Sequence, residues 1–170
     1  MNGMKFDQGK PRVDLIDPRF LLELGEVLSL YDENNEPAVE PKRYKAAALR
    51  RMYQYCVGEK VDKESSKSHL VHAACNLMFL YGNDSKFLLE LGEVLGFGAE
   101  KYGENNWQGV EPKRYKAAAL RHMYQYCSGE KVDKESGKSH LVHAACNLMF
   151  LYWSDKNEVR SESDSSLGNA

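Results

Sequence analysis

The sequence predicts an all-α protein, a helical bundle of two tandem three-helix repeats. Three observations favour this fold class. Apolar residues recur at helical spacing, no segment shows the alternation of a β-strand, and most of the sequence occurs twice. "FLLELGEVL" stands at 20–28 and at 87–95, and "EPKRYKAAALR" stands at 40–50 and at 111–121. We therefore expect the same set of three helices from each copy.

Local signals set the expected helix ends. The first helix of the second copy includes "FLLELGEVL" and is expected to run to about Tyr102, before Gly103. The second helix is expected to start at Pro112, because proline favours the first helical position, and to end before Gly129. The third helix has Ser139 as its expected N-cap and about residue 153 as its expected end.

The predicted organisation has four parts. A basic leader at 1–19 precedes a first, degenerate helical repeat at 20–82. A second helical repeat follows at 86–153. The remainder, 154–170, is strongly polar, so we expect a tail without regular structure.

The two copies are not equivalent. The second reads "GFGAEKYGENNWQGV" at 96–110, where the first has only "SLYDENNEPAV" at 29–39. Only the first copy follows the leader "KFDQGKPRVDLIDPR". Residues 1–28 joined to 96–170 would form one uninterrupted unit. Between 40 and 81 the copies differ at three positions only: Arg51/His122, Val57/Ser128 and Ser66/Gly137.

Composition excludes several classes of protein. A formal net charge of -2 argues against a nucleic-acid partner, which usually meets a basic surface. No run approaches the ~20 apolar residues of a membrane span, and no apolar signal segment opens the chain. The four cysteines form no CxxC pair, so we expect reduced thiols and a cytoplasmic location.

A polar stripe crosses the apolar third helix of the second copy. His140, His143 and Asn147 lie at i, i+3 and i+7, on one face of a helix that is otherwise apolar. Burying such groups without partners costs ~1–3 kcal/mol each, so each needs a partner. The stripe is either a core hydrogen-bond network or the floor of a catalytic site.

Four carboxylates are candidate metal ligands. Glu130 and Asp133 lie in "GEKVDKESGKSH", directly before the histidines, and Glu90 and Glu93 share one helix face in "ELGE". Hard cations such as Mg²⁺ or Mn²⁺ take carboxylate oxygens, often from paired residues on bundle helices. The alternatives are a solvated loop and an exposed helix edge.

Cationic and aromatic residues suggest contacts with a nucleotide. Lysine and arginine can hold phosphates, and asparagine and tryptophan can hold a base. The phosphate candidates are Lys5, Lys10, Lys101 and Arg121, and the base candidates are Asn105, Asn106 and Trp107. A turn with the tryptophan packed inward is the other interpretation of "FGAEKYGENNWQG".

Three separated motifs occur in the order seen in a known family. "KFDQGKPRVDLI", "FGAEKYGENNW" and "RYKAAALRHMYQYCSGEKVDKESGKSHLVHAACNLMFL" resemble a phage-associated domain family known as dATP/dGTP pyrophosphohydrolase, linked to the all-α MazG-like enzymes. The resemblance implies hydrolysis of a deoxynucleoside triphosphate to the monophosphate and pyrophosphate with Mg²⁺ or Mn²⁺. It also implies that Glu130 and Asp133, then Glu90 and Glu93, hold the metal, while His140 and His143 orient them or the attacking water.

The chain departs from the MazG-like pattern in one respect. "ELGE" fits the first half of the ExxE…ExxD motif, but the third helix offers histidines and Asn147 where the second acidic pair is expected. A second hypothesis is therefore a non-catalytic phage protein that sequesters a nucleotide or inhibits a host defence factor. A third is a purely structural helical module. The expected partners are a nucleotide, another copy of the chain or an internal pseudo-dimer, and a host protein.

Overall fold

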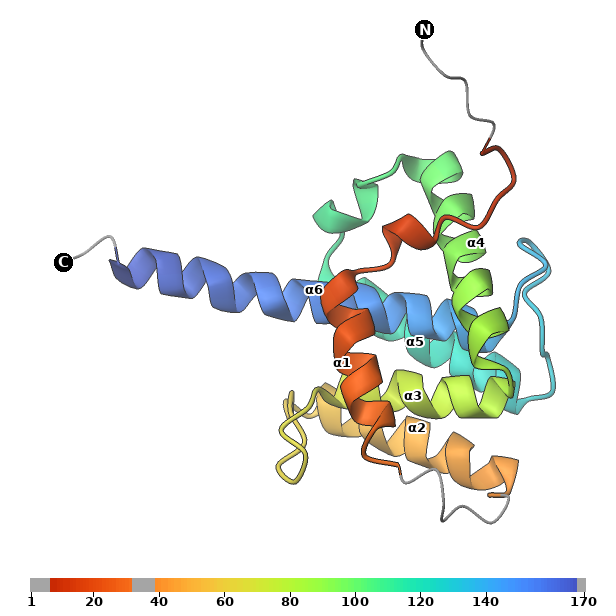
Figure 1. Ribbon diagram of the computed structural model, residues 1–170, viewed down its shortest axis with the longest axis horizontal. Helices are drawn as coiled ribbons and strands as arrows, with labels where there is room; N and C mark the ends of the chain where they lie inside the picture. The colour runs from red at the N-terminus through yellow and green to blue at the C-terminus, as the bar shows by residue number, and fades with distance from the viewer. Residues whose placement is uncertain (1–6, 32–38, 168–170) are drawn as a thin grey trace, which may run out of the picture.

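The computed structural model describes residues 7–31 and 39–167, and within them every regular element is helical (Figure 1). This confirms the all-α prediction. The elements run in the order η1 (Val13–Leu15), α1 (Pro18–Leu28), α2 (Pro41–Cys56), α3 (His69–Tyr81), α4 (Asp84–Tyr102), η2 (Asn106–Gly109), α5 (Pro112–Cys127) and α6 (His140–Leu167). The first repeat thus supplies α1 to α3 and the second supplies α4 to α6.

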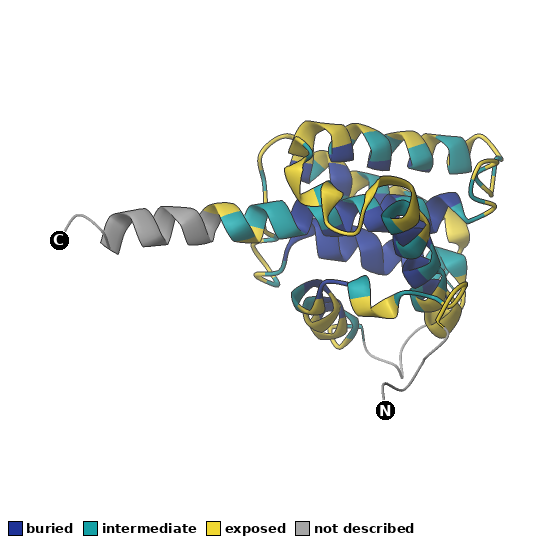
Figure 2. Ribbon diagram, turned by 90° about the horizontal axis from the view of Figure 1, so that it is seen from above, coloured by how far each residue is buried: buried dark blue, intermediate teal, exposed yellow. Residues whose placement is uncertain are grey.

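Two helices form the centre of the bundle. α3 packs against α6, and each carries its own neighbours, with α2 and α1 on α3 and α5 and α4 on α6. Figure 2 shows the buried residues gathered on these central helices and the exposed ones on the outer faces. Ten residues of α3 are buried, which explains why its sequence is apolar almost all round.

Equivalent side chains meet where the two repeats touch. The hydroxyls of Tyr53 and Tyr124, which occupy the same position in the two copies, lie 2.8 Å apart. Equivalent residues contact each other only near a two-fold axis, so the repeats are packed as two like subunits would be. The repeats also exchange contacts: Tyr152 donates to Glu23 of the first repeat, and Tyr81 donates to Glu90 of the second.

The helix ends follow the expected signals. α4 ends at Tyr102 before Gly103, and α5 begins at Pro112 and ends at Cys127, before Gly129. Ser68 and Ser139 each accept a hydrogen bond from the backbone N–H two residues on, at 3.1 and 3.2 Å, which stabilises the start of α3 and of α6.

The end of the chain differs from the expectation. Where a tail without regular structure was predicted from 154, α6 continues to Leu167 (Figure 1). Tertiary contacts hold its continuation: Asp155 accepts hydrogen bonds from Tyr55 at 3.0 Å and from Lys60 at 2.6 Å. A polar composition alone could not reveal that these residues have partners on the first repeat.

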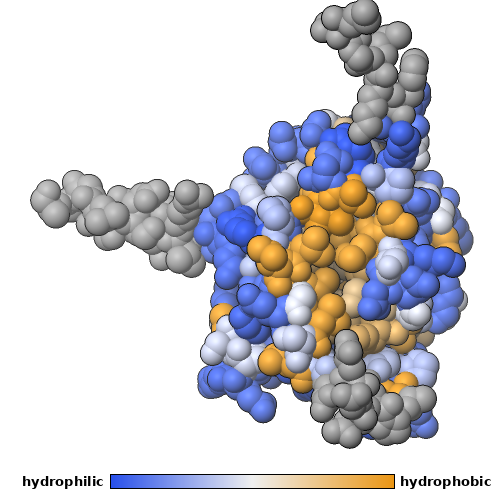
Figure 3. All heavy atoms as spheres, viewed as in Figure 1, coloured by the Kyte–Doolittle hydropathy of each residue, from blue (hydrophilic) through white to orange (hydrophobic). Residues whose placement is uncertain are grey.

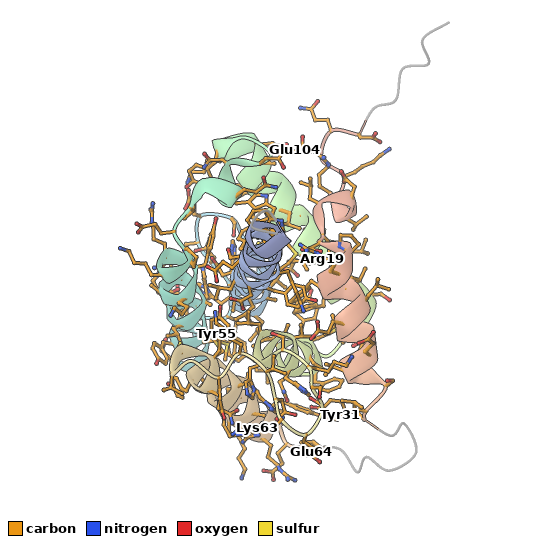
Figure 4. All side chains as sticks on the ribbon, turned by 90° about the vertical axis from the view of Figure 1, so that its left-hand side faces the viewer. Arg19, Tyr31, Tyr55, Lys63, Glu64 and Glu104 are labelled. Carbon is orange, nitrogen blue, oxygen red and sulfur yellow. The ribbon has the colours of Figure 1, made fainter. Side chains whose placement is uncertain are left out.

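The leader folds onto the second repeat. The backbone N–H of Arg12 donates to the carbonyl of Gly92 on α4 at 3.0 Å, and η1 packs along the same helix. A Cβ on Gly92 would lie 2.9 Å from the backbone nitrogen of Val13, so the contact requires glycine. Figure 4 labels Glu104, just beyond α4, whose carboxylate takes the Arg12 guanidinium at 3.2 Å.

Among the described residues, no segment covers the matching surface of the first repeat. Gly25 of α1 is the equivalent of Gly92, and a Cβ there would meet no atom within 4 Å. Figure 3 shows apolar side chains gathered on the face that α1 and α4 share with the leader.

In the described part of the chain, no helix is long and apolar enough to cross a membrane.

Candidate functional site

Each repeat closes one long loop onto the start of its central helix. The first loop, residues 57–68, leads into α3, and the second loop, residues 128–139, leads into α6. Figure 1 shows the two loops at opposite ends of the bundle, because α3 and α6 run in opposite directions. The loop, the central helix and the helix before it form one candidate site in each repeat.

An Asp–Ser–His chain of hydrogen bonds organises the second loop. The backbone N–H and hydroxyl of Ser136 donate to Oδ2 of Asp133 at 2.9 and 2.8 Å, and Nε2 of His143 lies 2.7 Å from the same hydroxyl. Since the hydroxyl hydrogen goes to the carboxylate, Nε2 of His143 carries the hydrogen and donates to Ser136. The first repeat repeats this chain with Asp62, Ser65 and His72.

Three histidines cluster in the second repeat. The Nδ1 atoms of His122, on α5, and His140, on α6, are 2.8 Å apart. The ring of His122 also stacks on that of His143, with centroids 4.7 Å apart and an angle of 13°. Nε2 of His140 is buried, with no hydrogen-bond partner among the described residues.

An arginine takes the place of His122 in the first repeat. Nη1 of Arg51 donates to Oδ1 of Asp62 at 2.8 Å and to Nδ1 of His69 at 3.2 Å. The side chains of Arg51 and Asp62 are 19% and 17% exposed, so this ion pair is largely shielded from water. The first site therefore contains a fixed positive charge at the position where the second has a neutral ring.

Burial favours the neutral form of four histidines. It lowers the pKa of His122 to about 4, helped by His143 and His140, and it lowers the pKa of His143. Burial, then the charge of Arg51, lowers the pKa of His72 to about 4 and also lowers that of His69. Partial burial acts to raise the pKa of Asp133, but the two hydrogen bonds from Ser136 and the nearby rings of His143 and His122 lower it, and the net shift is downward.

The four predicted metal carboxylates each have a partner within the protein. Glu90 accepts from the Ser139 backbone N–H at 2.6 Å and from Tyr81, and Glu93 pairs with Lys138. Glu130 lies 3.7 Å from Lys134. Together with the Ser136 bonds to Asp133, these contacts stabilise the loop.

As arranged, the carboxylates do not fit a Mg²⁺ or Mn²⁺ site. Among the residues whose side chains the structure describes, no three histidine, cysteine, aspartate or glutamate side chains are grouped as a metal site requires. A hard cation needs several converging oxygens, and these four carboxylates are directed to lysine, serine and tyrosine donors instead. The magnesium or manganese prediction therefore stays a prediction.

The predicted catalytic residues are brought together on one helix. His140 is buried, whereas the His143 side chain keeps 14% of its surface exposed, against 5% for His72. Asn147 donates to the carbonyl of His143 at 2.8 Å, one turn earlier on α6. The stripe is thus a connected network that remains open to solvent at His143 in the second repeat.

The predicted phosphate residues do not gather at one point. Lys10 pairs with Asp7 in the leader at 3.1 Å, and Lys101 pairs with Glu135 of the second loop. Arg121 lines an open pocket of about 440 Å³ on α5, together with Ala117, Leu120, Tyr124, Gln125 and Ser128. Lys5 lies outside the described residues. Among the described members of this set, Lys101 is the one with an ion pair to the second loop.

The predicted base residues separate into two groups. Asn105 and Asn106 are exposed. Trp107 stacks on Phe150 with centroids 4.7 Å apart, and its edge meets Trp153 at 4.9 Å. Its ring therefore packs against α6, as in the inward-packed alternative left open by the sequence.

Comparison with known families gives a double match. The model of the family described as "dATP/dGTP diphosphohydrolase, N-terminal" matches residues 1–86 and again residues 84–164. The chain belongs to this family. Both the resemblance and the duplication predicted from sequence are confirmed, since the two matches follow one another along the chain.

A phage relative carries the corresponding name. A dATP/dGTP diphosphohydrolase of Salmonella phage PMBT28 is 38% identical over 79 residues, which cover 46% of this chain and 27% of the relative. The chain thus matches about a quarter of the relative's length. No solved structure matches the chain. The double match means that this member of the dATP/dGTP diphosphohydrolase N-terminal family holds two copies of the matched domain.

Proposed function

We propose that this chain hydrolyses dATP or dGTP to the monophosphate and pyrophosphate, and that the second repeat with its leader is the working unit. The substrate class follows the family description and the name of the phage relative. We assign the activity to the second repeat because the leader packs against Gly92 of that repeat. Only the second repeat combines a leader, the glycine-rich segment and the tryptophan.

The residues of the second repeat suit proton transfer near a polyphosphate. His143 is neutral because burial lowers its pKa, its Nε2 is held by Ser136, and its side chain is partly exposed. A neutral imidazole whose Nε2–H is fixed in this way can take a proton from an attacking water only at its other nitrogen, Nδ1. Lys138 and Lys101 lie at the same loop and can balance phosphate charge when they leave Glu93 and Glu135.

Metal dependence is implied by the family resemblance alone. The family resemblance implies Mg²⁺ or Mn²⁺, which would supply a Lewis acid for the phosphate oxygens. The candidate carboxylates would have to exchange their present partners to hold it. We therefore assign no step of the reaction to a metal.

A second candidate function rests on the contacts that the candidate carboxylates make within the protein. Carboxylates held by lysine, serine and tyrosine suit a protein that binds a nucleotide without turnover. Such a protein would sequester nucleotides or act on a host protein. The two repeats pack like the two subunits of a dimer. We therefore propose that a single chain is enough for either function. The cysteines are free thiols, which supports the predicted cytoplasmic location.

The test is pyrophosphate release from dATP, dGTP, dCTP and dTTP with Mg²⁺, with Mn²⁺ and with a chelator, beside an Asp133→Ala variant. The proposal expects release from a purine substrate and its loss in the variant. Calorimetric binding of a nucleotide without release would favour the second candidate. A well-folded chain with neither release nor binding would contradict both.

A further inference from the structure

The positive charge of the protein is concentrated on two helices. α2 and α5 carry 9 of the 23 lysine and arginine residues and none of the 25 acidic residues. The rest of the chain has 14 basic residues against 25 acidic ones, a formal charge of -11. The overall net charge of -2 conceals this separation, so the argument from net charge against a nucleic-acid partner does not apply to these two helices.

The two helices lie next to each other and run in opposite directions (Figure 1). The equivalent residues Tyr53 and Tyr124, whose hydroxyls meet between them, are 45% and 49% exposed. Figure 4 shows α2 and α5 together on the side of the bundle away from α1. The outer sides of the two helices therefore share one surface, with the tyrosine pair where the helices meet.

Two arginines accompany each tyrosine. On each helix the three residues lie at i, i+7 and i+10, a spacing that places them on one side of the helix. All four arginines are exposed, and none forms an ion pair with another described residue. By contrast, Lys42 and Lys113 pair with the glutamates that precede their helices. This basic face consists of Arg43, Arg50 and Tyr53 on α2 and of Arg114, Arg121 and Tyr124 on α5.

The basic face is hollowed beside one of its tyrosines. The open pocket of about 440 Å³ on α5 is lined by Arg121 and Tyr124, with Ala117 and Leu120 as apolar neighbours. An aromatic ring beside an apolar surface can hold a base by stacking, and a guanidinium next to it can hold the phosphate attached to that base. Charge and shape therefore point to the same kind of ligand.

We propose that the basic face binds a single-stranded nucleic acid, with the four arginines at its phosphates and the two tyrosines at its bases. Arg43 and Arg50 are seven residues apart, about 10 Å along α2. The arginines are thus spread over two helices, where one strand can reach all of them and one nucleotide cannot. Stacking on tyrosine tolerates any base, so we expect little sequence preference. This proposal does not rest on the hydrolysis of dATP or dGTP.

The experiment is a titration of a fluorescently labelled oligothymidylate of about 20 nucleotides, followed by anisotropy. Four phosphate contacts predict a slope of about -3 for the logarithm of affinity against that of salt concentration, hence an affinity about fiftyfold lower at 200 mM salt than at 50 mM. No binding at 50 mM salt, or binding that salt does not weaken, would overturn the proposal. Displacement of the strand by an equal concentration of dTTP would overturn the assignment to a strand.

Matched charge variants locate the strand. Arg50→Gln with Arg121→Gln should weaken binding at least about tenfold and halve the salt slope. Lys63→Gln with Lys134→Gln is the control, because it removes two charges from equivalent loop positions that are 89% and 90% exposed. This control should bind like the parent. Equal weakening in both double variants, with circular dichroism showing both folded, would overturn the basic face as the site.

The tyrosines separate a single strand from a duplex. Tyr53→Leu with Tyr124→Leu should weaken binding about tenfold without changing the salt slope, because the rings stack on bases and carry no charge. Tyr53→Phe with Tyr124→Phe loses the same contact between hydroxyls but keeps the rings, and it should bind like the parent. Equal weakening in both variants, or tighter binding of a duplex of the same length than of the strand, would overturn the stacking role.

Discussion

The first and second repeats have almost the same sequence but differ in what surrounds them. Both contain the Asp–Ser–His chain, a capping serine and a glutamate that holds the loop. In the described part of the chain, the leader covers the first helix of the second repeat only. The first repeat has Arg51 beside its third helix, where the second repeat has His122. In the first repeat Arg51 forms an ion pair with Asp62, whereas the residue at the same position of the second repeat, His122, is neutral. A duplicated domain can thus retain its fold in both copies while the surroundings of the equivalent sites diverge.

Removing the positive charge of Arg51 should have the largest effect on stability. Arg51→Ala leaves the shielded carboxylate of Asp62 without its partner, which should lower the free energy of unfolding by about 3 kcal/mol. His122→Ala in the second repeat should cost only about 1 kcal/mol, the typical value of one lost hydrogen bond. Urea denaturation of both variants checks the ranking. Equal losses would contradict the conclusion that the Arg51–Asp62 ion pair stabilises the first repeat.

The leader contact gives the next largest contrast. Gly92→Ala places a methyl group against the backbone of Val13, and it should destabilise the protein by about 2 kcal/mol. Gly25→Ala is the matched control, with open space around it and up to about 1 kcal/mol to gain from helix propensity. Thermal unfolding separates the two, and limited proteolysis should cut the leader only in the first variant. A stable Gly92→Ala protein with a protected leader would refute the packing of the leader against Gly92.

The neutral histidines predict a dependence on pH. The pKa of His72 and of His122 is about 4 in the folded protein, below the ordinary value of about 6.5 for the unfolded chain. Between these values the unfolded chain binds more protons, so stability must fall as the pH falls from about 6.5 towards 4. His122→Arg removes one such group and should reduce the fall in melting temperature between pH 7 and pH 5. An unchanged slope would mean that His122 is not held neutral.

The smallest expected effect concerns a turn. Ser66 has a φ of 59°, a left-handed conformation that costs free energy for any residue with a Cβ, whereas its equivalent Gly137 adopts a φ of 70° without that cost. Ser66→Gly should stabilise the first repeat by about 0.5 kcal/mol, and Gly137→Ser should destabilise the second by a similar amount. Chemical denaturation of both variants measures the pair. Two changes of the same sign would contradict this reading of the turn.

Local signals predicted the fold well. Pro112, Gly103 and the capping serines set helix ends that the structure reproduces, because such signals act over a few residues of backbone. The duplication was also visible directly. The seat of the leader was not, since Gly25 and Gly92 stand in the identical sequence "FLLELGEVL" and only the three-dimensional course of the chain distinguishes them.

The candidate site was predicted only in part. The stripe of His140, His143 and Asn147 was correctly expected to have partners, but the four candidate carboxylates of the loop and of α4 bind lysines, serines and a tyrosine, which no spacing rule reveals. His122 was missed as a site residue. Its signal was present, because Arg51/His122 is one of three differences between the copies. Its meaning required the positions of Asp62 and His69 around the arginine.

The central claim is that the second repeat acts and the first supports it. The most direct measurement is pyrophosphate release from dATP and dGTP by His143→Gln and by His72→Gln, each compared at a temperature where both are fully folded. The account predicts loss of release in His143→Gln and nearly unchanged release in His72→Gln. Equal loss in both, or loss only in His72→Gln, would contradict it.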